Sequence, residues 1–126
     1  MFSGYWEDAE ATATASVTFD GVAMTEVATI TVGAGSGAEY SGFAGLWYLN
    51  EALLPTTAGN KQVVVTASEA ITREIYVTVA EYTGVAQDPL DDYATHSRNV
   101  SGNTAVTLTA SDDGSVVVAV GVQGGG

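Results

Sequence analysis

The sequence predicts an all-β protein: an antiparallel β-sandwich of about eight strands with immunoglobulin-like or jelly-roll topology. Residues that favour β-sheets (Val, Thr, Ile, Tyr and Phe) dominate every periodic segment. Apolar side chains recur at a spacing of two, and turn residues separate the runs at intervals of roughly ten residues. The 126 residues, 46% hydrophobic and 14% charged, predict one folded domain over residues 1–122, with a glycine-rich tail or linker at 123–126.

Each apolar run is a strand candidate of its own. The chain begins almost inside a strand, and the clearest candidates after that are residues 13–19, 22–32, 43–49, 61–67, 73–82, 104–110 and 115–122. In the runs 73–82 and 115–122, both alternating faces carry residues that suit a covered surface. This pattern is typical of central strands, so we expect Val77 and Val118 to be buried between two sheets.

The turn residues support the same architecture. Asp20-Gly21 supplies the two positive φ angles of a two-residue type I′ hairpin, and residues 111–115 (SDDGS) join the last two strands in a similar way. The connections 50–60 and 87–103 are longer, and we expect a short helical turn in the second. Glycines in the segment 33–42 match a loose phosphate-binding pattern, but strand-like residues follow instead of a helix, which indicates an ordinary loop.

Charge excludes several classes of partner. Three basic residues face fifteen acidic ones, for a net charge of −12. Nucleic acids and anionic membrane surfaces are therefore poor partners, and no apolar run is long enough to insert into a membrane. A strongly acidic, lysine-poor surface stays soluble in salty water, which favours an extracellular setting. The chain contains no cysteine, so its redox compartment cannot be read from the sequence.

No catalytic motif emerges. His96 is the only histidine, with Ser97 beside it and Asp91 and Asp92 before it. Sequence neighbours rarely achieve the geometry of a Ser-His-Asp relay, and one histidine without cysteine cannot hold zinc. We expect His96 to be a solvated loop residue and the protein not to be an enzyme.

Two kinds of binding site remain as hypotheses. Asp88, Asp91 and Asp92 are candidate calcium ligands, because calcium prefers clustered carboxylate and carbonyl oxygens, although aspartate is also an ordinary turn residue. Trp6, Tyr40 and Tyr93 are the candidate contact aromatics for a glycan or protein surface. By contrast, Trp47 lies between Leu46 and Leu49 and is expected in the core.

The order of VTFDGVAMT, LWYL, VVVTAS, AEYTGVAQDPLDD and GSVVVAVG, from about Val17 to Val122, resembles a β-sandwich domain that recurs in marine bacterial and bacteriophage virion and surface proteins. Such domains usually carry one or two further strands upstream. The resemblance therefore implies a first sheet that is incomplete or completed by a neighbour. It also implies a structural or adhesion module, and it transfers no catalytic residue.

Together these features predict a non-catalytic structural or interaction domain on a phage virion (decoration, fibre or tail-associated) or on a bacterial cell surface. We expect it to assemble through loops and strand edges with itself or with other virion or surface proteins, as a homo-oligomer or part of a larger assembly. The alternative is a carbohydrate-binding module that uses loop aromatics, with calcium as an optional ligand and no other cofactor.

Overall fold

The chain is all-β, as the sequence predicts. The computed structural model describes residues 2–8, 14–32, 41–68, 70–71, 75–85, 92–96, 103, 105–109 and 117–121. Its strands are β1 (Phe2–Asp8), β2 (Ala15–Phe19), β3 (Val22–Ala23), β4 (Thr25–Val32), β5 (Ser41–Tyr48), β6 (Val63–Ala67) and β7 (Ile75–Val79). All of their pairings are antiparallel.

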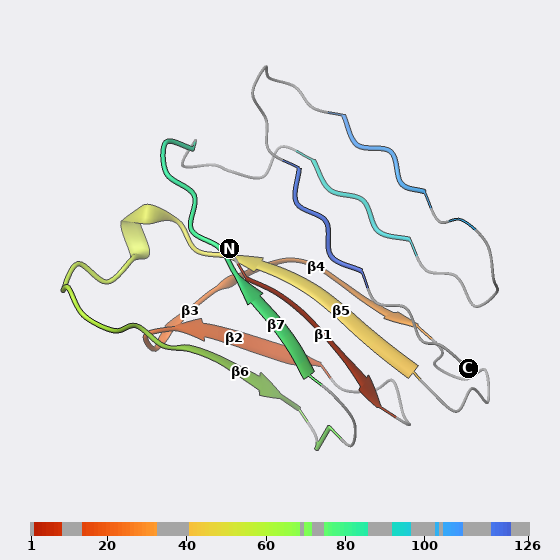
Figure 1. Ribbon diagram of the computed structural model, residues 1–126, viewed down its shortest axis with the longest axis horizontal. Helices are drawn as coiled ribbons and strands as arrows, with labels where there is room; N and C mark the ends of the chain where they lie inside the picture. Colours follow the sequence, from red (N-terminus) through yellow and green to blue (C-terminus); the bar gives the residue numbers. More distant parts are fainter. Residues whose placement is uncertain are drawn as a thin grey trace.

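The strands form two sheets (Figure 1). One has the order β4-β5-β1-β7 and the other the order β3-β2-β6. The N-terminal strand β1 lies inside the larger sheet, with β5 on one side and β7 on the other. The expectation that the chain begins almost inside a strand is therefore confirmed, and this strand joins β5 to β7.

The predicted Asp20-Gly21 hairpin is confirmed. It connects β2 to β3, with Phe19 paired to Val22, and its two turn residues have φ angles of 50° and 82°. Both angles lie in the left-handed region that a type I′ turn requires. Glycine reaches this region without strain and aspartate tolerates it, so the local sequence alone is enough to specify this turn.

The core lies between the two sheets. Val17 of β2 is buried together with Phe43 and Trp47 of β5. The rings of Phe43 and Trp47 have centroids 6.3 Å apart. The partly buried residues packed against this cluster are Ala15, Met24, Val63, Val65 and Ile71. The prediction that Trp47 is a core residue is confirmed, since only 2% of it is exposed.

The C-terminal strand predictions are wrong for the residues that the structure describes. Segments 105–109 and 117–121 belong to neither sheet, and Figure 1 draws both as tubes without arrows. Val118 is half-buried, not fully covered. The alternation of apolar side chains and the β-propensity of residues indicate that a segment fits a pleated surface. A strand also needs a neighbouring strand with which to form backbone hydrogen bonds. The eight-strand sandwich is therefore not confirmed by the described residues.

The helical turn expected in the second long connection stays a prediction, because most of residues 87–103 lie outside the described residues. A 3₁₀ turn, η1, spans Glu51–Leu53 in the first long connection. In the second connection, residues 92–96 and 103 are the described part, and they contain no helix. The two backbone bonds of η1, from Leu53 N–H to the Asn50 carbonyl and from Leu54 N–H to the Glu51 carbonyl, are both 3.0 Å long. Local bonding of this kind is common in short connecting turns.

Candidate functional site

Among the strands whose side-chain exposure is described, the edge strand β7 is the most exposed apolar one. All five of its residues are exposed, and Val77 in its middle is 53% exposed. β7 lies at the end of the four-stranded sheet with β1 as its neighbour, and no other described strand pairs with it. The prediction that this run is a covered central strand with Val77 buried is therefore wrong.

The register explains why an apolar strand is exposed. Val77 is the Cα partner of Gly4, which is in turn the partner of Gly45 in β5. Gly45, Gly4 and Val77 therefore lie side by side across three neighbouring strands, from β5 through β1 to β7. Among the described residues, the core cluster includes no side chain of β7. Among the described side chains, it is Phe43 and Trp47 of β5 that form the core cluster with Val17 of the three-stranded sheet.

Nothing within β7 protects the edge. Natural edge strands discourage pairing with other chains by means of charged side chains, proline, bulges or short length. The sequence Ile75–Val79 contains no charge and no proline, and its register with β1 runs without a shift. The strand therefore has the features of a pairing surface.

The predicted contact aromatics are not brought together as a set by the described residues. Tyr93 is 56% exposed, as predicted. Trp6 lies within β1, where its Cα partners are Phe43 and Ile75, and so it belongs to a paired strand and not to a loop. Tyr40 lies outside the described residues.

Of the three predicted calcium ligands, Asp88 and Asp91 lie outside the described residues. Asp92 is exposed, and both of its carboxylate oxygens accept backbone hydrogen bonds, from the N–H of Tyr93 at 2.8 Å and from the N–H of Thr109 at 3.0 Å. In the part of the chain that the structure covers, no three acidic or histidine side chains form a group able to hold a metal ion. The calcium hypothesis stays a prediction.

The residues considered for catalysis are described only in part. His96 is exposed, in agreement with the expectation of a solvated loop histidine. Of the other residues considered with it, Ser97 and Asp91 lie outside the described residues, and the Asp92 carboxylate accepts the two backbone hydrogen bonds given above. The described geometry therefore assigns no chemical step to His96.

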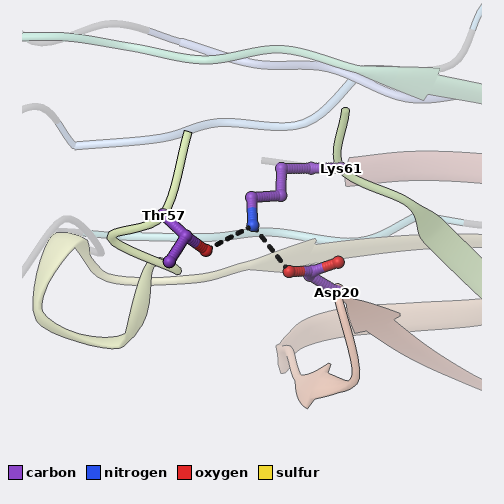
Figure 2. A network of polar contacts seen from close by, with 3 residues as sticks. All are labelled: Asp20, Thr57 and Lys61. Carbon is purple, nitrogen blue, oxygen red and sulfur yellow. Dashed lines mark hydrogen bonds and ion pairs between the residues drawn. The ribbon is translucent and has the colours of Figure 1, made fainter. Parts of the chain in front are cut away.

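A polar network anchors the β2–β3 hairpin to the connection before β6 (Figure 2). The Lys61 ammonium donates to the Asp20 carboxylate at 2.8 Å and to the Thr57 hydroxyl at 3.1 Å. In addition, the Asp20 N–H donates to the Gln62 carbonyl at 2.7 Å. Asp20 therefore has two roles, as turn former and as ion-pair partner. The network is partly exposed and its role is structural.

Exposed apolar side chains also occur outside β7. The large ones are Leu53, Leu54, Val64, Tyr82, Val85, Tyr93, Val106, Leu108 and Val117. Scattered exposed apolar residues are normal on soluble proteins, so none of these outweighs a strand in which every residue is exposed. The described part of the chain includes no helix with the length and apolar character needed to cross a bilayer.

Comparison with known proteins adds no further assignment. No protein family, curated protein or solved structure matches the chain. The resemblance to phage and bacterial surface domains therefore stays a prediction, and the candidate site rests on the geometry of β7.

Proposed function

We propose that this chain is a non-catalytic structural and interaction domain that assembles with other protein chains through its sheet edge and loops. The observation that supports this most directly is the exposure of all five residues of β7 at the end of the four-stranded sheet. A strand added to such an edge gains backbone hydrogen bonds, and its alternate side chains gain apolar contacts.

The distribution of charge supports the same function. The chain has a net charge of −12, so most of its surface repels another acidic molecule. The uncharged strand β7 is a place where a partner approaches with the least repulsion. Association through β7 should therefore strengthen as salt screens the rest of the surface.

The proposal also covers the complete fold of the domain and its location. The complete domain is an immunoglobulin-like or jelly-roll β-sandwich that acts outside the cell, on a phage particle or a bacterial surface, within a homo-oligomer or larger assembly. The acidic composition and the resemblance of the sequence to virion and surface domains support this location.

The experiment is sedimentation velocity over a range of protein concentrations, at low and at high salt. We expect the average mass to rise with concentration, and to rise further at high salt. A strictly monomeric protein up to its solubility limit would argue against the proposal. For the location, an antibody raised against the chain should label intact, unpermeabilised cells or particles, and labelling only after lysis would contradict it.

The second candidate is a carbohydrate-binding module, favoured by the exposure of Tyr93. An exposed tyrosine offers a flat ring on which a sugar packs. A glycan array distinguishes the two functions: binding that is lost in Tyr93→Ala and kept in Tyr82→Ala, a second exposed tyrosine, would favour the sugar-binding function. The absence of any binding to the array would remove it.

A further inference from the structure

We infer that β7 pairs with β7 of a second copy of this chain, antiparallel and centred on Val77. Two four-stranded sheets then become one continuous sheet across a two-fold axis. The inference rests on the proposed function and makes it specific, since it names the edge, the partner and the register.

The sequence of β7 is self-complementary in this register. Val77 faces Val77 of the second copy, and Ile75 faces Val79. Tyr76 faces Thr78. Because directly opposed residues in an antiparallel pair share a face of the sheet, the apolar row Ile75, Val77 and Val79 meets the same row of its partner. A two-fold interface requires such self-complementarity.

The other edges of the two sheets are poorer candidates. β4 carries the exposed Glu26 and a register shift between Glu26 and Ala28, both of which discourage pairing. β3 is only two residues long. In β6 the exposure alternates, because Val63 and Val65 pack against the core. β7 alone among the described edge strands combines full exposure, no charge and an unshifted register.

Cysteine cross-linking tests the register directly, because the chain has no native cysteine. Opposed Cα atoms in an antiparallel ladder lie about 4.5–5.5 Å apart, within the range that a disulfide spans. Val77→Cys should therefore form a covalent dimer under mild oxidation. Thr78→Cys alone should not, since the two copies of residue 78 are roughly 8 Å apart when each faces residue 76.

A mixture of Tyr76→Cys and Thr78→Cys tests the same register with a positive result. Because residue 76 faces residue 78 of the second copy, we expect a disulfide-linked dimer of the two variants. Val64→Cys on β6, where the side chain is also exposed, is the matched control and should stay uncross-linked. If Thr78→Cys cross-links as readily as Val77→Cys, or if Val64→Cys does so, the inferred pairing is wrong.

A charge at the centre of the interface gives an independent measurement. In Val77→Lys two ammonium groups face each other, and like charges directly opposed destabilise a strand pair. We expect association to weaken by about tenfold or more, which corresponds to 1.4 kcal/mol, while Val64→Lys leaves it unchanged. Far-ultraviolet circular dichroism checks that both variants fold. The Val77→Cys result does not depend on the lysine variant.

The outcomes separate this inference from the proposed function. A protein that self-associates without cross-linking at residue 77 retains the proposed function and overturns the β7 pairing. A protein that stays monomeric at every concentration overturns the β7 pairing and argues against the proposed function.

Discussion

The indole ring of Trp47 lies over the α-carbon of Gly45, two residues earlier on the same strand. A Cβ added to Gly45 would collide with the Cη2 and Cζ3 atoms of that ring and lie 3.1 Å from Cε1 of Phe43. Because Gly45 has no side chain, it leaves room for the indole ring of Trp47, the largest core side chain, to lie flat on β5. The two residues form one packing unit.

Gly45→Ala should destabilise the protein by about 1–3 kcal/mol, the typical cost of forcing an extra methyl group into a packed core. Urea unfolding followed by Trp fluorescence measures the change. Gly121→Ala is the matched control, because a Cβ there meets nothing within 4 Å, and it should change the free energy of unfolding by less than about 0.5 kcal/mol. Equal stabilities for the two variants would mean that Trp47 does not occupy this position.

Val17 and Val77 provide a second comparison, because the same residue type is buried in β2 and exposed in β7. Val17→Ala removes two buried methyl groups and should lower the free energy of unfolding by about 2 kcal/mol. Val77→Ala should lower it by less than about 0.5 kcal/mol at low protein concentration, where the chain is monomeric. A large loss for Val77→Ala in the monomer would show that β7 is covered by its own chain.

The ion pair between Asp20 and Lys61 should contribute about 0.5 kcal/mol, as expected for a partly exposed pair. Asp20→Asn retains a residue that tolerates the positive φ of the turn, so a double-mutant cycle with Lys61→Met isolates the side-chain coupling. The coupling should shrink in about 1 M salt, where the screening length falls to roughly 3 Å. A coupling that persists at that salt concentration would contradict a screened surface pair.

The Asp92 carboxylate connects its own loop to Thr109 through the 3.0 Å backbone hydrogen bond. In Asp92→Ala, hydrogen exchange at the Thr109 amide should accelerate by about fivefold, which corresponds to a hydrogen bond worth about 1 kcal/mol. Exchange at the amides of β5 should not change. Unchanged exchange at Thr109 would show that the bond does not form in solution.

Adding calcium to the unmodified protein tests the metal hypothesis. An ion bound at Asp92 must shift the NMR resonance of the Thr109 amide, which donates to the same carboxylate.

Local chemistry allowed part of the fold to be predicted. The Asp20-Gly21 turn followed from two residues whose backbone preferences match one turn type. The strands at 15–19, 41–48, 63–67 and 75–79 overlap the runs 13–19, 43–49, 61–67 and 73–82, which alternating β-favouring side chains predicted. Trp47 was assigned to the core because leucines flank it in an apolar strand.

The candidate site was predicted less well. The sequence suggested that strand edges make the contacts but assigned β7 to the interior, because a strand covered by its own chain and one awaiting another chain have the same apolar composition. Tyr93 was correctly expected to be exposed. Trp6 stays a predicted contact residue, and what the structure adds is that its strand, β1, lies between β5 and β7 in the larger sheet.

By itself, the sequence determined that this chain forms antiparallel β-structure, where one tight hairpin turns, and which indole enters the core. Those properties depend on a few neighbouring residues. Only the tertiary structure decided that β1 lies between β5 and β7, that β7 is an edge, and that segments 105–109 and 117–121 join neither sheet. Strand order and coverage depend on contacts between residues far apart in the chain, and side-chain alternation does not encode which strand becomes whose neighbour.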